Sequence, residues 1–265
     1  MKTFTTLLSF ALLASTSTSA QAEELREVRH TDCSAEPAGE QVAQATSIAT
    51  QWNSITSEYV TSDGGFRYAA LAANEAHNAL LDQLVAQVAS ASTSELTDPE
   101  RLVFLINAYN ILVVDDMLVL WPVESVLSED GFFDGRTHTV AGAEMTLNAL
   151  ENEHIRGFGD PRIHFAVNCA SDSCPPLLAD AFTVANYEEL ANTAAQAYVR
   201  ATARVDREAG AIAVSQIFEW FAGDFSEEAG VREFVASHLA DAADAAIART
   251  GAISYWPYDW STNAR

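Results

Sequence analysis

Lysine is almost missing from this sequence. The 265 residues hold 14 lysines and arginines together, and Lys2 is the only lysine. Lys2 lies in an N-terminal segment that we expect to be removed, so the mature protein would have none. Without lysine a protein cannot form a Schiff base on a side chain, anchor pyridoxal phosphate or hold a phosphate on a Walker-type lysine. These classes of enzyme are not expected.

Positive charge is scarce in general. Asp and Glu number 37 against those 14 cations, and the formal net charge is -23. A field of this sign repels nucleic acid and anionic lipid headgroups. The sequence also lacks a glycine-rich phosphate loop after a predicted strand and a Cys-x-x-Cys-His motif. We therefore expect no nucleic acid partner and no nucleotide, flavin, haem or other cofactor. An unknown small molecule or peptide is the expected partner, and the oligomeric state stays open.

Residues 1–22 are typical of a cleaved signal peptide. Lys2 precedes an apolar run from Leu7 to Leu13, and Ala20-Gln21-Ala22 supplies the small residues that a signal peptidase requires. The apolar run is too short to span a bilayer. We expect an exported protein, periplasmic in the first place and secreted otherwise.

The other long apolar stretch, residues 102–120, is predicted to be a helix in the centre of the fold. It contains Asn107, Asn110, Asp115 and Asp116, and each of these side chains is costly in hydrocarbon. We expect the two aspartates to mark the solvent end of the helix. The mature chain is therefore not expected to insert into a membrane.

The sequence has no internal repeat and no low-complexity linker, which predicts a single domain over residues 40–265 after a loose lead-in at 23–39. Apolar spacing and capping residues predict the helices: 41–59, 69–89, 99–120 (capped by Thr97-Asp98-Pro99-Glu100 and stopped by Trp121-Pro122), a short one after Thr146, 186–203, 216–222 and 231–248. Strand signals predict a hairpin at 137–146, a buried strand at 162–168, a hairpin around Glu208-Ala209-Gly210 and an extended segment at 253–258. The expected fold class is α+β, a helix-rich domain with a small, mainly antiparallel sheet.

The segment 162–176 has the highest density of chemically reactive side chains. It places His164, Asn168, Cys169 and Cys174 at and after the predicted strand. If the strand alternates regularly, His164 and Asn168 share one face and Cys169 lies on the other, so Cys174 has more freedom to approach the imidazole. A thiol nucleophile needs a nearby cation or a helix N-terminus to lower its pKa, and His164 or Arg162 could supply the charge.

Five interpretations of this segment remain open, and the simplest is packing alone. An oxidising compartment favours a disulfide, of Cys169 with Cys174 or of one of them with Cys33, and the odd cysteine count leaves at least one thiol over. A thiol hydrolase or transferase would use His164 as its base. A metal site of His164, Cys169 and Cys174 lacks the two-residue gap of common zinc sites. A redox pair would have a four-residue gap instead of the two-residue thioredoxin gap.

Other polar residues are candidates for supporting roles. Asn107 and Asn110 share one helix face and either tie loop backbone to the core or orient His164. Asp259, in the aromatic C-terminal segment 255–263, either docks with that segment or accepts a hydrogen bond from an imidazole. Glu151 and His154, three residues apart, form a weaker acid and base pair.

Several motifs together resemble the domain of unknown function 547 family. They are Asn107-Ala108-Tyr109-Asn110, Trp121-Pro122-Val123, the segment 160–171, Ser173-Cys174-Pro175-Pro176-Leu177, Ile217-Phe218-Glu219-Trp220-Phe221 with Asp224-Phe225, and Tyr258-Asp259-Trp260. The resemblance covers about residues 97–263, and its most specific part is the cysteine segment. It implies a fold more than a reaction.

The order of the motifs is also similar to that of the papain and transglutaminase class: a central helix, then a strand with a histidine, then a later aspartate. That class carries its nucleophilic cysteine at the start of the central helix, whereas residues 99–120 contain no cysteine. Either Cys169 or Cys174 has taken over as nucleophile, or the scaffold binds without cleaving.

The first hypothesis for function is an exported thiol hydrolase or acyl transferase that acts on an amide or thioester bond. Its nucleophile would be Cys169 or Cys174, its base His164, its orienting group Asp259 or Asn107, and its oxyanion donors Asn168 or backbone amides. The second hypothesis is a non-catalytic ligand- or protein-binding domain whose cysteine loop is closed by a structural disulfide.

Overall fold

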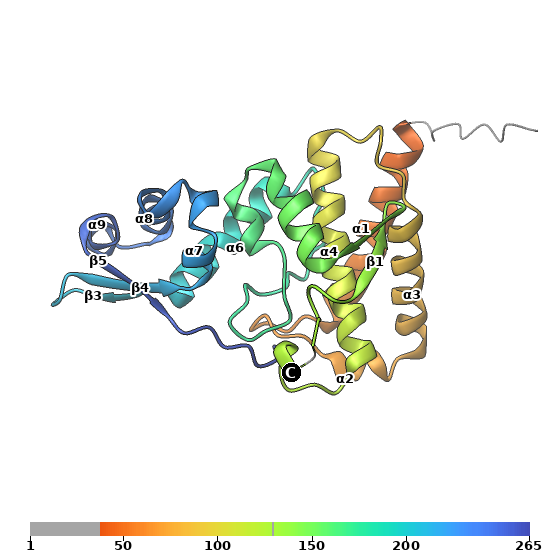
Figure 1. The fold of residues 1–265 in the computed structure, drawn as a ribbon, viewed down its shortest axis with the longest axis horizontal. Coiled ribbons are helices and arrows are strands. Elements are labelled where there is room, and N and C mark those ends of the chain that lie inside the picture. The colour runs from red at the N-terminus through yellow and green to blue at the C-terminus, as the bar shows by residue number, and fades with distance from the viewer. Residues whose placement is uncertain (1–37, 129) are drawn as a thin grey trace, which may run out of the picture. The chain divides into compact units, whose positions relative to one another are not determined.

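The computed structural model describes residues 38–128 and 130–265 (Figure 1). These residues belong to one compact unit that begins at residue 36. The predicted signal peptide, most of the predicted lead-in and Cys33 lie outside the described residues.

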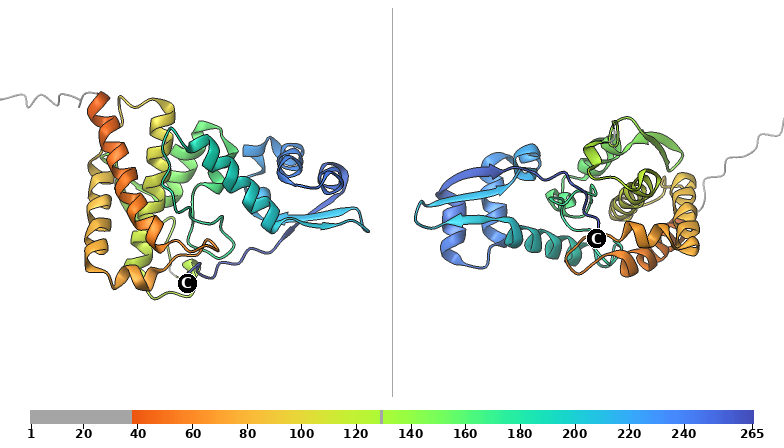
Figure 2. Two further views of the ribbon diagram at one scale, coloured as in Figure 1. Left: turned by 180° about the vertical axis from the view of Figure 1, so that it is seen from behind. Right: turned by 90° about the horizontal axis from the view of Figure 1, so that it is seen from below.

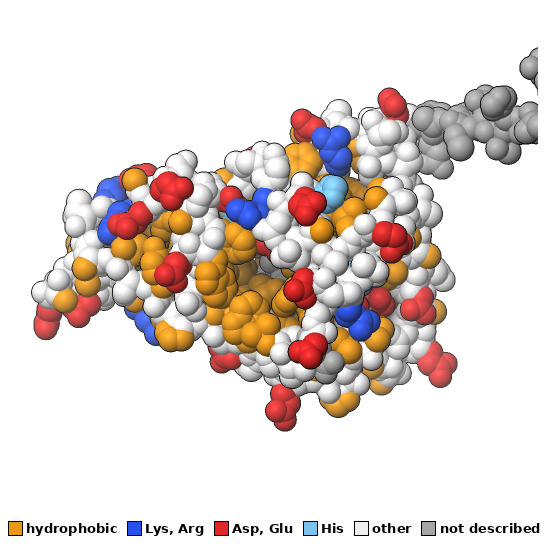
Figure 3. Space-filling model, viewed as in Figure 1, with side chains coloured by type: hydrophobic (Ala, Val, Ile, Leu, Met, Phe, Trp, Pro, Cys, Tyr) orange, Lys and Arg blue, Asp and Glu red, His pale blue; other side chains and the backbone are white. Residues whose placement is uncertain are grey.

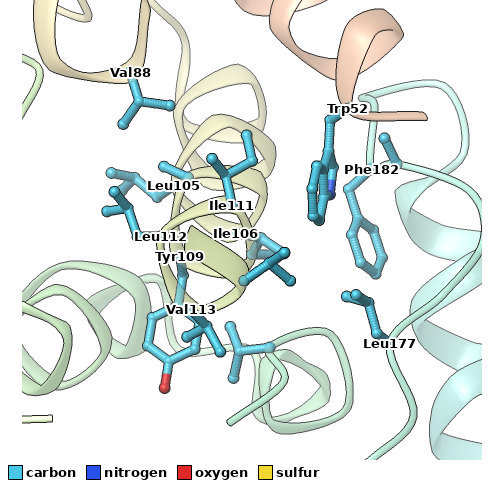
Figure 4. Packing of buried hydrophobic residues seen from close by; sticks show 14 of the residues in the cluster. Trp52, Val88, Leu105, Ile106, Tyr109, Ile111, Leu112, Val113, Leu177 and Phe182 are labelled. Carbon is cyan, nitrogen blue, oxygen red and sulfur yellow. The ribbon is translucent and has the colours of Figure 1, made fainter. Parts of the chain in front are cut away.

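A layer of helices surrounds the central helix α4, Asp98–Leu120. Thr97 and Glu100 form the predicted capping box, a proline lies in the first turn, and the helix ends before Trp121. Side chains from neighbouring segments, Trp52, Val88 and Phe182 among them, pack around α4 (Figure 4). The helix is long and apolar enough to cross a membrane, but 83% of its apolar window is buried inside the protein, as expected for a core helix.

Three helices precede α4 in the part of the chain that the structure describes. They are α1 (Ala38–Tyr59), α2 (Tyr68–Ala72) and α3 (Glu75–Ser90). The single helix predicted over 69–89 is thus two helices, because the Asn74 side chain accepts a hydrogen bond from the backbone N–H of His77 and starts a new helix.

The predicted hairpin after α4 is confirmed. A short 3₁₀ turn, η1 (Val126–Ser128), leads to β1 (Thr137–Val140), which pairs antiparallel with β2 (Ala143–Thr146). The Thr146 hydroxyl then caps α5 (Leu147–Ala149), which continues as the π-helix η2 (Leu150–Ile155) and the 3₁₀ turn η3 (Arg156–Phe158).

The burial of Asp116 differs from the prediction. Its side chain is buried, whereas the sequence predicted a position at the solvent end of the helix. Its Oδ1 accepts a hydrogen bond of 2.8 Å from Nε of Arg136, which comes from the approach to β1. Since a buried carboxylate without its cation is strongly unfavourable, we expect Arg136→Ala to lower the free energy of unfolding by about 3 kcal/mol. Urea unfolding at pH 7 measures this. Arg101→Ala is the control, because the exposed Arg101–Asp98 pair contributes at most about 1 kcal/mol. Equal losses in both variants would contradict the prediction.

The strand predicted at 162–168 is wrong. This segment forms the 3₁₀ helix η4 (Pro161–Phe165), in which the Asp160 side chain caps the backbone N–H of Arg162. A proline at the first position and an aspartate before it favour a helical turn. Ile163 to Asn168 are all buried, so the assumed alternation of faces does not exist.

The remaining elements build a small second layer of helices on a three-stranded sheet. They are α6 (Tyr187–Thr202), β3 (Arg204–Asp206), β4 (Ala211–Ser215), α7 (Ile217–Trp220), η5 (Ala222–Phe225), α8 (Glu227–His238), α9 (Ala242–Thr250) and β5 (Ala252–Trp256). The helix predicted over 231–248 is divided because Asp241 caps a new helix. β3 pairs antiparallel with β4, and β5 pairs parallel with β4. The fold is α+β with a small, mainly antiparallel set of strands, as predicted.

The C-terminal segment runs from β5 back to the helical layer, as the two views of Figure 2 show. It makes isolated bridges between Ser125 and Ser261, between Ser171 and Thr262, and between Phe66 and Ala264. The aromatic segment is therefore docked on the core, and it holds the loop after η4 in place.

Candidate functional site

A cavity of about 200 Å³ lies where α4, η2, the loop after η4, α7 and the C-terminal segment meet. Figure 3 shows hydrophobic side chains around a hollow on this face. The aromatic lining residues are Tyr109, Phe133, Trp220, Phe221, Tyr258 and Trp260, and the polar ones include Asn148, Glu151, Asn152, His164, Cys169 and Cys174. The cavity thus brings His164 and both predicted thiols together.

Cys169 lies at the wall of the cavity, and its sulfur is 3.3 Å from the Tyr258 hydroxyl and 3.0 Å from that of Ser171. The Ser171 hydroxyl donates to that of Tyr258 over 3.0 Å, which leaves the Tyr258 proton to point at the sulfur. Burial acts to raise the pKa of Cys169, but hydrogen bonding with Cys174, Ser171 and Tyr258 lowers the pKa below that of an ordinary thiol. This hydrogen bonding favours the thiolate form of Cys169.

The backbone after Cys169 is unusual. Ala170 is a buried non-glycine residue with a φ of 60°, a conformation that costs an L-residue roughly 1–2 kcal/mol. The Asn168 side chain accepts a hydrogen bond from the N–H of Ala170 and holds this turn. The turn places Ser171 beside the Cys169 sulfur.

Cys169 and Cys174 are both free thiols. The backbone N–H of Cys169 donates to the Cys174 sulfur over 2.9 Å. Cys174 is buried, and burial together with the neighbouring Cys169 raises its pKa. Of the two thiols, Cys169 is the more exposed one and Cys174 is buried.

His164 is 3% exposed, and its Nε2 lies 2.8 Å from Oδ2 of Asp224 on η5. Asp224 also receives two hydrogen bonds from Arg156, at 2.6 and 2.7 Å, and these bonds hold its pKa below the usual range. The imidazole stacks on Phe221 at 4.0 Å between ring centroids. Burial lowers the pKa of His164 to about 4, so the ring is neutral at pH 7 and donates Nε2–H to the aspartate.

Glu151 faces the other side of the same imidazole. Its Oε1 lies 3.8 Å from Nδ1 of His164, and its side chain is 16% exposed. Burial and the nearby charge of Cys169 raise the pKa of Glu151 to about 7, although a hydrogen bond with Tyr109 acts in the opposite direction. Glu151 therefore exchanges a proton in the physiological range.

The asparagines are not part of the reactive group. Asn107 binds backbone N–H and C=O of Phe182 and so does not orient His164. Asn168 is buried, and its side chain donates to the C=O of Pro175 and accepts from the N–H of Ala170. Asn110 accepts from the N–H of Asn168 and donates to the C=O of Ala166. These residues fix the loop that carries Cys169.

Asp259 is exposed, and its carboxylate accepts from the backbone and hydroxyl of Ser261. It is not the carboxylate partner of His164. That partner is Asp224, which was not predicted from the sequence although Asp224-Phe225 is one of the family motifs. Tyr258 was also not predicted from the sequence as the donor to Cys169. Among the described residues, no group of three or more His, Cys, Asp and Glu side chains could hold a metal ion.

Comparison with known proteins yields a single family. The search of curated proteins gave no match, and the search of solved structures gave none. The model of the family described as "Protein of unknown function, DUF547" matches residues 93–199, which include α4, Glu151, His164 and both described cysteines. This match supports the assignment of residues 93–199 of this chain to the DUF547 family.

Proposed function

We propose that this protein is a cysteine-dependent hydrolase or acyl transferase that acts on an amide or thioester bond, with Cys169 as its nucleophile. The observation that carries this proposal is the position of the Cys169 sulfur, at a cavity wall and beside the Tyr258 hydroxyl. A hydrogen bond from the Tyr258 hydroxyl favours the thiolate there, and the thiolate is the nucleophilic form of cysteine.

The cavity walls support an uncharged acyl group as the part of the substrate that lies against Cys169. Six of the lining side chains are aromatic, and neither lysine nor arginine lines the cavity. A substrate carboxylate or phosphate would find no cation there to offset its desolvation. We further propose that the protein works after export, in the periplasm, without a cofactor.

The competing hypothesis of a binding domain requires a disulfide staple between Cys169 and Cys174. Both residues are free thiols, and hydrogen bonds of Asn110 and Asn168 already hold the loop. A staple is not needed to fix this segment, and the thiol enzyme accounts better for the lowered pKa of Cys169.

Alkylation by iodoacetamide tests the state of the thiol. Because its pKa is lowered, Cys169 is expected to be thiolate at pH 6 to a larger extent than a thiol with pKa 8.5, of which roughly one part in 300 is thiolate. The lower nucleophilicity of a weakly basic thiolate offsets part of this gain, so we expect Cys169 to react about tenfold faster than glutathione. Peptide mass spectrometry over pH 5–9 gives the rate and the midpoint.

Tyr258→Phe should move that midpoint to higher pH, because it removes the hydroxyl and keeps the ring. Tyr255→Phe on β5 is the matched control and should leave the midpoint unchanged. A Cys169 midpoint near 8.5 in the wild-type protein would contradict the proposed activation of this thiol.

Trapping with 4-nitrophenyl acetate tests the acyl transfer itself. We expect one acetyl group on the peptide that contains Cys169 and none in Cys169→Ala, while Cys174→Ala retains the adduct. An acetyl group on Cys174 instead, or no adduct on a protein with a reactive Cys169, would overturn the proposed function.

A further inference from the structure

A thiol enzyme needs a second group that donates and accepts protons, and the surroundings of the His164 imidazole indicate which group this is. Both ring nitrogens of His164 face carboxylates: Nε2 lies 2.8 Å from Asp224, and Nδ1 lies 3.8 Å from Glu151. Asp224 is held by Arg156 through two short hydrogen bonds. The imidazole is thus enclosed between η2 and η5, with Nε2 hydrogen-bonded to Asp224 and Nδ1 facing Glu151 at a distance longer than a hydrogen bond.

Among the described residues that line the cavity with Cys169, Glu151 is the one carboxylic acid. Arg156, the nearest cation, is engaged with Asp224 and with Asn152. The groups that face Glu151 are Tyr109 from α4, His164 from η4, Cys169 from the following loop, Arg156 from η3 and Asp224 from η5.

We propose that Glu151 is the general acid and base of the Cys169 reaction, and that His164, whose Nδ1 faces the Glu151 carboxyl, is a positioning residue. This inference rests on the proposed function. The neutral imidazole donates Nε2–H to Asp224, which leaves a lone pair on Nδ1 that faces Oε1 of Glu151. A protonated Glu151 carboxyl complements this lone pair. The pKa of Glu151, raised to about 7 by burial and by Cys169, supplies both protonation states near neutral pH.

The steps balance without a co-reactant other than water. The Cys169 thiolate attacks the acyl carbon, and a carbon–sulfur bond forms. The bond to the leaving nitrogen or sulfur breaks while the Glu151 carboxyl gives that atom its proton. Water then attacks the thioester and passes its proton to the Glu151 carboxylate. The carbon–sulfur bond breaks, and Cys169 returns as a thiolate with a free acid as product. In a transferase, an amine, alcohol or thiol takes the place of water.

Two acetyl compounds separate the roles of the two residues. 4-Nitrophenyl acetate has a leaving group that needs no proton, whereas the leaving aniline of 4-nitroacetanilide does. In Glu151→Gln we expect acetylation of Cys169 by the ester to continue, and the acetyl-Cys169 to accumulate because hydrolysis lacks its base. Cleavage of the anilide should fall by about a hundredfold. Glu151→Asp should regain part of that loss.

The rate of Cys169 alkylation by iodoacetamide distinguishes proton transfer by Glu151 from a merely structural role. If the role of Glu151 were structural, Glu151→Gln would lower this rate. The rate of Cys169 alkylation in Glu151→Gln should stay within about twofold of that of the wild-type protein, because the hydroxyl donors remain. Glu153→Gln is the matched control, since Glu153 is an exposed residue of the same helix η2, and it should behave as the wild-type protein in every assay.

Three results would overturn this assignment in distinguishable ways. Anilide cleavage by Glu151→Gln at the wild-type rate would show that Glu151 moves no proton. A parallel loss of alkylation and cleavage would make its role structural. If the wild-type protein neither carried acetyl-Cys169 nor released 4-nitrophenolate by turnover, the proposed function itself would be removed, and the assignment with it.

Discussion

Asn110→Ala is expected to lower the free energy of unfolding by about 4 kcal/mol and to slow the alkylation of Cys169. Asn110 lies in the buried centre of α4, where its carboxamide binds the N–H of Asn168 and the C=O of Ala166. The substitution leaves two buried backbone groups without partners, each at a cost of roughly 1–3 kcal/mol. Total stabilities are commonly 5–15 kcal/mol, so the loss is a large part of the whole.

The effect on Cys169 follows from the position of these bonds in the chain. They fix the backbone one residue before Cys169, and the hydrogen bond from Ala170 to Asn168 fixes it one residue after. When this loop relaxes, the sulfur loses its alignment with the Tyr258 hydroxyl. Urea unfolding and iodoacetamide labelling at pH 6 give the two readouts.

Asn107→Ala is the control for the loop. Asn107 lies one helical turn from Asn110, and its carboxamide makes the same pair of bonds to the backbone of Phe182. We expect a similar loss of stability and an unchanged rate of Cys169 alkylation. If Asn107→Ala slowed alkylation as much as Asn110→Ala does, the special link between Asn110 and the cysteine loop would be refuted.

The sequence predicted those parts of the fold that depend on neighbouring residues. The capping box at Thr97 and Glu100 and the stop before Pro122 fix the ends of α4, and alternation around tight turns fixes both hairpins. The prediction for the segment 162–168 was wrong because a short run of apolar residues occurs in buried strands and in buried turns alike. Asp160 and Pro161 were the signal for the turn.

The composition of the site was harder to predict, since it depends on contacts across the fold. His164 and Asp224 are separated by 60 residues, and Cys169 and Tyr258 by 89. Asp259 was chosen as the partner of the imidazole because it is next to aromatic residues, yet η5 brings Asp224 there instead. Glu151 looked like a surface residue because η2 is polar on both sides, and its burial arises from the contact between η2 and α4.

Folding lowers the pKa of His164 and raises that of Glu151. Their contributions to the pH dependence of the free energy of unfolding therefore oppose each other in the wild-type protein. The pKa of His164 falls from about 6.5 to about 4 on folding because of burial. The unfolded chain binds the proton more readily, so acidification from pH 6.5 to 4 destabilises the fold by about 3 kcal/mol. The pKa of Glu151 rises from about 4.5 to about 7. Its stabilisation is complete below pH 4.5 and is lost, by about 3 kcal/mol, as the pH rises to 7.

The two contributions nearly cancel between pH 4.5 and 6.5, because His164 gains what Glu151 loses as the pH rises. Glu151→Gln removes the contribution of Glu151. As the pH is lowered from 7 to 4.5, the free energy of unfolding of Glu151→Gln should therefore fall by about 3 kcal/mol relative to that of Glu153→Gln. Other titrating groups, Asp115 among them, are common to both variants and drop out of the difference. Urea unfolding at half-unit pH intervals measures it. A difference that does not change with pH would mean that the Glu151 carboxyl titrates alike in the folded and unfolded protein, and Glu151 would then hold no proton at pH 7 to give to a leaving group.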